Sequence, residues 1–197
     1  MEDKHSQPHA IMVPMPLQGH LLPHTHLAMK LASHGFTITF VNTQHIHHQI
    51  TKSQPNDTED QDDIFATARK SGLDIRYKTN HNQAVEGLLH VFPAHVDELV
   101  GNLVQSDPSV TCLIADTFHP WSANIANKYN LVNISFWTEP ALVISIYYHL
   151  DLLREHGHYG SHDNREDTIN YIPGVQAIEP KDLMSHLQEA DISTPMH

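Results

Sequence analysis

The chain has 197 residues, of which 40% are hydrophobic and 17% charged, a composition that suits one globular domain with its own core. Its formal net charge of -12 repels phosphate backbones and anionic lipids, so nucleic-acid binding is excluded as a function. A single cysteine, Cys112, rules out an internal disulfide and predicts a reducing, cytoplasmic location. The sequence carries neither a signal-peptide pattern nor an apolar run long enough to cross a bilayer, so we expect no integral membrane segment.

Strands and helices are predicted to alternate along the chain. Residues 1–8 are expected to be a flexible tail, and residues 9–197 one domain. Apolar segments predict strands over residues 9–14, 36–42, 73–77, 110–115 and 132–137. Helical periodicity or capping predicts helices over residues 19–34, 45–52, 85–103, 120–128 and 141–155. The alternation predicts an α/β fold with a Rossmann-like, doubly wound parallel sheet.

Local signals refine the boundaries of these elements. Gly35 is expected to end the first helix, because glycine readily adopts the left-handed conformation found there. Pro93 lacks a backbone donor and is expected to kink the longest helix. Thr138 and Pro140 resemble a helix start, with a hydroxyl cap followed by a proline in the first turn. The segment 54–63 is rich in acids and is predicted to be a solvated loop.

This topology predicts that two side chains able to act together in catalysis, those of His20 and Asp116, lie close to each other. The common strand order of such a sheet, 3-2-1-4-5, makes the first and fourth strands neighbours at the switch point where ligands bind. His20 follows the first strand and Asp116 ends the fourth, so we expect them to face each other. A carboxylate beside an imidazole fixes its tautomer and stabilises the imidazolium, so the pair can activate a hydroxyl. The other interpretation is a histidine at a helix start and an aspartate at a strand end that share no function.

Five motifs occur in an order and at separations that resemble one known family. They are Pro14-Met-Pro-Leu-Gln-Gly-His20, Gly35-Phe-Thr-Ile-Thr-Phe-Val-Asn-Thr43, Val110-Thr-Cys-Leu-Ile-Ala-Asp116, Phe136-Trp-Thr138 and Ile172-Pro-Gly174. Together they resemble the plant-type family of UDP-dependent glycosyltransferases over essentially all of residues 9–190. The resemblance implies that the chain forms most of the N-terminal, acceptor-binding half of a glycosyltransferase B fold, so that this domain is expected to be incomplete.

The resemblance also implies roles for individual residues. His20 matches the general base that deprotonates an acceptor hydroxyl, and Asp116 matches the residue that orients and charges this base. Transfer from a UDP-sugar would invert the sugar's anomeric configuration, with no metal and no cofactor besides the UDP-sugar co-substrate. Thr138 matches a residue near the donor sugar or its phosphates, and Gly19 is assigned to the donor side as well. A helix cap is the other interpretation of Thr138.

Four further residues are candidates for the acceptor site. Phe118, His119 and Trp121 follow Asp116 directly, and apolar walls with few polar groups suit small lipophilic acceptors. Packing against the following helix is the other interpretation of these three residues. His24 lies on the otherwise apolar face of the first helix, where relatives more often carry a hydrophobic residue. It either contacts the acceptor or reduces the packing of the helix.

The remaining signals argue against other kinds of site. His45, His47 and His48 lack a neighbouring acid or cysteine, so we expect solvated histidines and no metal site. The chain has no G-x-G-x-x-G or P-loop sequence, which disfavours a dinucleotide or nucleoside triphosphate site. It also lacks the donor signature of the family's C-terminal half, so we expect the donor-binding domain to be absent and the chain alone to be inactive.

Two other interpretations remain open. One is a non-catalytic, truncated remnant that only binds hydrophobic small molecules. The other is an unrelated nucleotide-binding α/β domain, which predicts tight binding of a cofactor such as NAD. Under the glycosyltransferase interpretation the expected partners are a UDP-sugar and a small-molecule acceptor, and the chain is expected to be a monomer.

Overall fold

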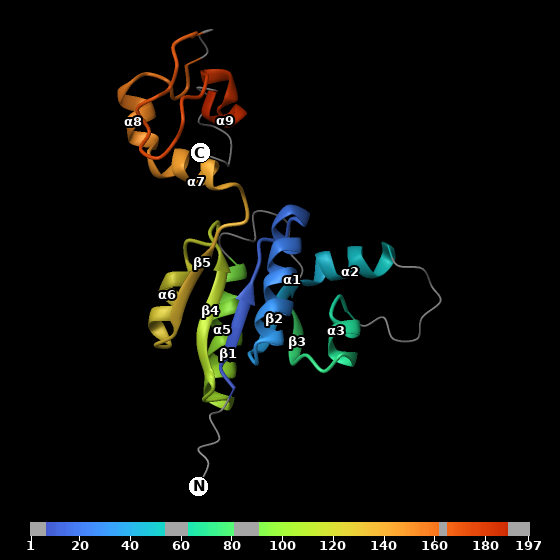
Figure 1. Ribbon diagram of the computed structural model, residues 1–197. Helices are drawn as coiled ribbons and strands as arrows, with labels where there is room; N and C mark the ends of the chain where they lie inside the picture. The colour runs from blue at the N-terminus through green and yellow to red at the C-terminus, as the bar shows by residue number, and fades with distance from the viewer. Residues whose placement is uncertain (1–6, 54–62, 81–90, 162–164, 189–197) are drawn as a thin grey trace. The chain divides into compact units, whose positions relative to one another are not determined.

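The computed structural model describes residues 7–53, 63–80, 91–161 and 165–188 (Figure 1). Most of the predicted tail, nearly all of the acidic segment 54–63, and the first part of the helix predicted over 85–103 lie outside these residues. The described residues form two compact units, divided between Thr138 and Glu139. The extent of the predicted domain, residues 9–197, stays a prediction.

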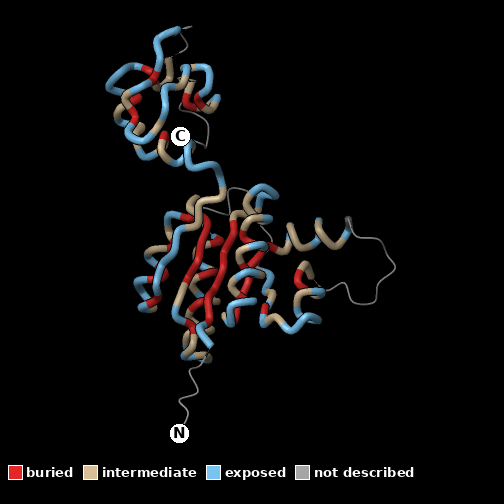
Figure 2. Tube along the Cα trace, viewed as in Figure 1, coloured by how far each residue is buried: buried red, intermediate tan, exposed pale blue. Residues whose placement is uncertain are grey.

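The first unit is built on a five-stranded sheet in which every pair of neighbouring strands is parallel. The strands are β1 (His9–Val13), β2 (Thr37–Thr43), β3 (Ile75–Asn80), β4 (Val110–Asp116) and β5 (Val132–Phe136). Their spatial order is β3-β2-β1-β4-β5, which confirms the order predicted from the sequence. Strands β1 and β2 are buried throughout, as expected for strands covered by helices on both faces (Figure 2).

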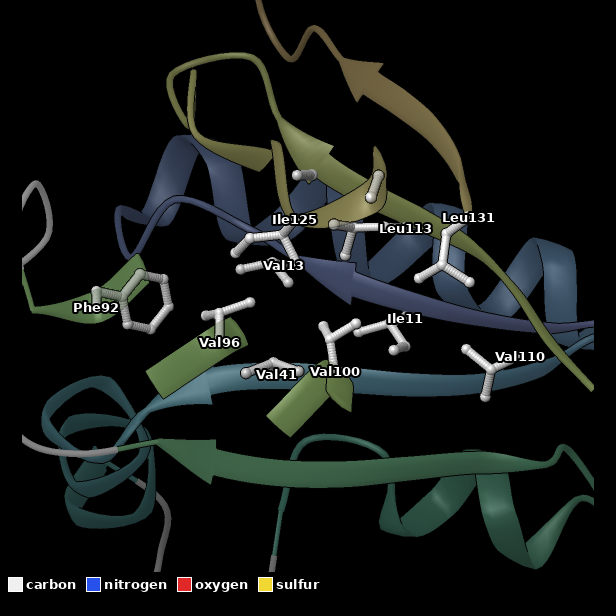
Figure 3. Close-up of a cluster of buried hydrophobic side chains, with 12 residues drawn as sticks. Ile11, Val13, Val41, Phe92, Val96, Val100, Val110, Leu113, Ile125 and Leu131 are labelled. Atoms are coloured by element: carbon white, nitrogen blue, oxygen red, sulfur yellow. The ribbon is translucent and has the colours of Figure 1, made fainter. Parts of the chain in front are cut away.

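Helices cover both faces of this sheet. They are α1 (Gln18–Ser33) on one face, and α5 (Phe92–Ser106) and α6 (Ser122–Lys128) on the other. Along β1, Ala10 and Met12 pack toward α1, while Ile11 and Val13 pack toward α5 and α6 (Figure 3). Because side chains alternate along a strand, this burial on both faces explains the continuous apolar run of β1. The doubly wound α/β prediction is thereby confirmed.

Most of the described helix boundaries follow the predicted signals. Gly35 has a φ of 88° just after α1, as expected for a glycine that ends a helix. Pro93 lies in the first turn of α5, where a missing backbone donor is tolerated, and residues 85–90 lie outside the described residues, so the predicted kink stays a prediction. The helix predicted over 141–155 is interrupted at His149, which leaves helical geometry with a φ of -121°. The other helices of the first unit, among the residues that the structure describes, are α2 (Gln44–Ser53) and α3 (Ala66–Lys70).

The second unit consists of short helices around a small core of its own. Its helices are α7 (Ala141–Tyr148), α8 (Leu150–Glu155), η1 (Pro180–Asp182) and α9 (Ser185–Gln188). Six buried hydrophobic residues form its core: Ile146, Leu153, Ile169, Ile172, Leu183 and Leu187. Ile169 and Ile178 pair as an isolated antiparallel bridge, and Gly174 lies between them with a φ of 76°. Among the helices that the structure describes, none combines the length and apolarity needed to span a bilayer.

Candidate active site

The carboxyl ends of β1, β4 and β5 lie side by side at one edge of the sheet (Figure 1). Val13 pairs with Ala115, and Asp116 pairs with Phe136, so the residues that follow these strands emerge together. Parallel strands present their carboxyl ends at the same edge, and this is where ligands bind in open α/β sheets. This edge brings together His20, at the start of α1, with Asp116 and Thr138.

His20 and Asp116 are in direct contact, as their positions in the sequence predict. Nδ1 of His20 lies 2.8 Å from Oδ2 of Asp116. The carboxyl group is almost fully buried, and its other oxygen accepts a hydrogen bond of 3.0 Å from the backbone N–H of Phe118. A carboxylate only accepts hydrogen bonds, so the proton of a neutral His20 lies on Nδ1 and donates to Asp116. Nε2 is then the nitrogen with a free lone pair.

The imidazole of His20 remains accessible while its partner is buried. Its side chain is 12% exposed and that of Asp116 is 1% exposed. All hydrogen bonds of the ring to described residues are made by Nδ1, so none of them occupies Nε2. Phe118 lies against the ring edge to face, with 5.4 Å between ring centroids. The arrangement leaves one basic nitrogen available to a hydroxyl, which is the geometry that a general base requires.

Thr138 is a third member of this arrangement. Its Oγ1 lies 2.9 Å from Nδ1 of His20, the same nitrogen that contacts Asp116. Since that N–H donates to the carboxylate, the hydroxyl oxygen accepts a share of the same proton. The interpretation of Thr138 as a helix cap is wrong, because the cap position of α7 is occupied by Pro140 and no side chain bonds there. Its position after the strand next to β4 is a signal that could have predicted the contact with His20.

His24 is placed differently from the expected acceptor contact. Its side chain is completely buried, so it has no surface with which to touch an acceptor. Nδ1 of His24 donates to the backbone carbonyl of His20 over 2.9 Å, and the ring packs edge to face on Phe136. Burial lowers the pKa of His24, which keeps the imidazole neutral near pH 7. The expected acceptor contact of His24 is therefore not available in this structure, and the other expectation, that His24 reduces the packing of the helix, stays a prediction.

His119 is also buried rather than exposed to a cleft. Its side chain is 2% exposed, and Nε2 lies 3.3 Å from the backbone oxygen of Pro14, to which it donates. Burial lowers the pKa of His119 as well. Trp121 packs on His119 and Phe92 and lines a hollow of about 320 Å³ over α5 and α6. The expected acceptor contact of His119 is therefore not available in this structure, and that of Trp121 stays a prediction.

Gly19 and Phe118 remain candidates for ligand contact. Gly19 is exposed directly before His20, and a Cβ atom placed on it would meet nothing within 4 Å. The space beside this glycine is thus open, although its assignment to the donor side stays a prediction. Phe118 is half-buried between the rings of His20 and Trp137. It is the one acceptor candidate whose ring contacts the imidazole of the pair.

A second histidine–aspartate pair lies at the opposite end of β1 and was not predicted. Nδ1 of His9 lies 3.0 Å from Oδ2 of Asp107, and Nε2 lies 2.8 Å from the hydroxyl of Thr39. Both ring nitrogens are therefore occupied, and the side chain is completely buried. Hydrogen bonds from Ser109 hold the pKa of Asp107 well below its usual range. This closed pair can join strands but has no free nitrogen for a substrate.

The histidines of α2 are not arranged as a metal site in the described part of the chain. His45 contacts Gln49 over 2.8 Å, and the ring of His47 lies 5.6 Å from that of Tyr77. In the part of the chain that the structure describes, no group of three histidine, cysteine or acidic side chains is arranged to hold a metal ion. That the chain needs no metal stays a prediction.

Comparison by sequence places this chain beside plant glycosyltransferases. UDP-glycosyltransferase 86A1 of Arabidopsis thaliana is 58% identical, over 95% of this chain and 41% of the relative. UDP-glycosyltransferase 86A2 of the same plant is 53% identical, over 98% of this chain and 42% of the relative. Linamarin synthase 1 of Manihot esculenta is 30% identical, over 96% of this chain and 42% of the relative. No protein-family model matches the chain.

Comparison of structures gives the same result for the fold. A UDP-glucose:anthocyanidin 3-O-glucosyltransferase in complex with UDP matches with a TM-score of 0.67 and 23% identity, over 95% of this chain and 42% of that protein. UGT2 of Phytolacca americana, complexed with UDP-2-fluoro-glucose and pterostilbene, matches with a TM-score of 0.65 and 21% identity, over 93% of this chain and 42% of that protein. These likenesses identify the fold as the N-terminal half of a glycosyltransferase B fold.

The sequence relatives contradict the interpretation as an unrelated nucleotide-binding domain, because they cover nearly the whole chain at high identity. The chain spans about two fifths of the length of the curated relatives that it matches. It therefore belongs to the plant-type family of UDP-dependent glycosyltransferases, of which it represents an N-terminal part.

Proposed function

We propose that this chain supplies the acceptor side and the general base of an inverting UDP-sugar glycosyltransferase. The acceptor is a small lipophilic molecule with a hydroxyl group, and the donor is a UDP-sugar. The observation that carries the proposal is the contact between His20 and Asp116, which leaves Nε2 of His20 free of described partners. The family membership supports the reaction class, since the relatives are UDP-glycosyltransferases by name.

In the proposed reaction, Nε2 of His20 takes the proton of the acceptor hydroxyl. The oxygen attacks the anomeric carbon of the sugar while the bond from that carbon to the UDP oxygen breaks. UDP leaves with the bonding electrons, and attack from the opposite side inverts the anomeric configuration. Asp116 accepts the Nδ1 hydrogen bond throughout and stabilises the imidazolium that forms. The proposed reaction needs no metal ion.

Phe118 supports the acceptor class. Its ring contacts the imidazole of His20, so it offers an apolar surface beside the base. We further propose that Gly19 leaves room for the donor next to His20, because a Cβ atom there would enter open space. A cytoplasmic location is proposed from the single cysteine, Cys112, which is free. The protein is proposed to act as a monomer.

The base is tested in an enzyme that joins this chain to the C-terminal part of UDP-glycosyltransferase 86A1, called the joined enzyme below. Release of UDP from UDP-glucose is measured with a panel of small lipophilic alcohols and phenols. We expect the joined enzyme to turn over and the chain alone to be inactive. His20→Ala and Asp116→Asn should each lower kcat by roughly 10²–10⁴-fold, the usual contribution of a positioned base.

The control is His26→Gln, which changes an exposed histidine of the same helix and should leave kcat unchanged. A joined enzyme that turns over equally well with His20→Ala would contradict the role of this residue. A joined enzyme that folds, binds the acceptors and releases no UDP would instead favour the remnant that only binds hydrophobic molecules.

A further inference from the structure

His24 is a buried imidazole that the proposed reaction does not use directly. Its side chain has no exposed surface and shares the buried stripe of α1 with Ala28 and Ala32. An unbonded polar atom in such a place costs about 1–3 kcal/mol, a cost that an aliphatic side chain would avoid. On packing grounds alone, a histidine is therefore unexpected at this position.

One ring nitrogen of His24 is bonded to the backbone of His20. Nδ1 lies 2.9 Å from that carbonyl oxygen, which can only accept, so Nδ1 carries the proton. Nε2 is then unprotonated, and it is buried with no hydrogen-bond partner among the described residues. The bonded ring nitrogen of His24, Nδ1, is thus the one that contacts the backbone of His20.

This bond acts on the part of α1 that carries the base. His20 lies in the first turn, where helices fray most readily. Pro23 has no N–H, so the carbonyl of Gly19 loses its usual partner within the helix. Nδ1 of His24 adds a donor to the next carbonyl, that of His20, and the hydroxyl of Thr25 adds one to the carbonyl after it, over 2.9 Å. Only the bond from His24 is to the backbone of His20 itself; the bond from Thr25 is to the backbone of Leu21.

We propose that His24 is a positioning residue for His20. By holding the backbone carbonyl of His20, it keeps Nδ1 of that residue aligned with Asp116 and keeps Nε2 free. Its own ring lies close to the same carboxylate, with 3.9 Å from Nδ1 to Oδ2 of Asp116. Because His24 is neutral, it forms no ion pair with Asp116 and does not compete with His20 for this carboxylate. Among the described residues, the other titratable groups that face this cluster are His20 itself and His119, and burial also lowers the pKa of His119.

The proposal rests on the proposed role of His20, but the state of both rings can be measured without turnover. The experiment is ¹⁵N NMR of the imidazoles in the 197-residue chain, which reports the tautomer of each histidine. In the unmodified chain we expect both His20 and His24 to carry the proton on Nδ1. A His24 with its proton on Nε2 would overturn the proposal, because Nδ1 could not then donate to the carbonyl.

Three variants separate positioning from packing. His24→Leu removes the donor and keeps an aliphatic side chain in the core, so His20 should lose its single tautomer. His24→Asn keeps an N–H near the position of Nδ1 and should restore it. Thr25→Val is the matched control, because it removes a similar bond to the neighbouring carbonyl without touching His20. Unchanged His20 signals in folded His24→Leu would overturn the proposal. If that variant does not fold, the tautomer of His24 in the unmodified chain decides.

Kinetics of the joined enzyme give the second measurement. His24→Leu should lower kcat by at least about tenfold with the KM for UDP-glucose unchanged, since small misplacements of a catalytic group are costly. His24→Asn should recover most of this loss. If the NMR results hold but His20→Ala has no effect on turnover, the proposed function fails while the positioning of His20 stands.

Discussion

At the scale of single residues, the candidate site depends on which nitrogen of His20 carries the proton. Asp116 and Thr138 both approach Nδ1, at 2.8 Å and 2.9 Å. The carboxylate fixes the proton there, because it cannot donate one itself. Thr138 then acts as a second acceptor for the same N–H, which limits rotation of the ring. The base is thus oriented by two partners that lie on two different segments of the chain.

Thr138→Val in the joined enzyme tests this second partner. Valine has nearly the same shape but no hydroxyl, so the share of the Nδ1 hydrogen bond is lost. Since one net hydrogen bond is worth about 1 kcal/mol, we expect kcat to fall roughly fivefold with the KM for UDP-glucose unchanged. The matched control is Thr117→Val, which removes a hydroxyl that bonds Ser135 over 2.8 Å and does not touch His20. A higher KM with unchanged kcat would indicate that Thr138 acts on the donor sugar instead.

At the scale of elements, two histidine–aspartate pairs join β4 or its flanking residues to the β1–α1 segment, one at each end. His20 and Asp116 lie 96 residues apart in the sequence, and His9 and Asp107 lie 98 apart. Their surroundings differ. His9 donates to Asp107 and accepts from Thr39, so both of its ring nitrogens are bonded. The side chain of His20 is 12% exposed, and its bonds to described residues leave Nε2 unoccupied. We therefore assign the pair of His9 and Asp107 a role in the stability of the fold.

Asp107→Ala should destabilise the first unit without affecting the candidate site. The Nδ1–H of the fully buried His9 would lose its acceptor, which costs about 1–3 kcal/mol. We expect a lower urea midpoint by circular dichroism and an unchanged His20 tautomer by NMR. Asp97→Ala, which breaks an exposed ion pair with Lys128, is the matched control and should move the midpoint little. Equal midpoints for the two variants would contradict the assignment.

At the scale of the whole molecule, buried histidines link stability to pH. Burial lowers the pKa of His9, His24 and His119 below the ordinary value of about 6.5. The unfolded chain binds protons at these residues before the folded chain does. The part of the stability that depends on these three histidines is therefore fully present above about pH 6.5. It is lost as the pH falls toward their lower pKa values in the folded state.

Urea unfolding at pH 7.5 and pH 5.5 tests this linkage. Each such histidine contributes at most about 1.4 kcal/mol per pH unit, so the three together lower the free energy of unfolding by up to about 4 kcal/mol per unit. His24→Asn removes one titrating group and should reduce the slope by about a third. The exposed His26→Gln is the control and should leave the slope unchanged. A free energy of unfolding that rises on acidification would contradict the direction expected.

The sequence by itself determined the sheet, its strand order and the meeting of His20 with Asp116. Apolar strands that alternate with helices leave few arrangements, and parallel strands bring their carboxyl ends to one edge. Only the tertiary structure decided that His24 and His119 are buried, that Thr138 faces His20 instead of capping α7, and that His9 forms a second, closed pair. The physical reason is that burial and side-chain direction depend on neighbours far away in the sequence, which local periodicity does not encode.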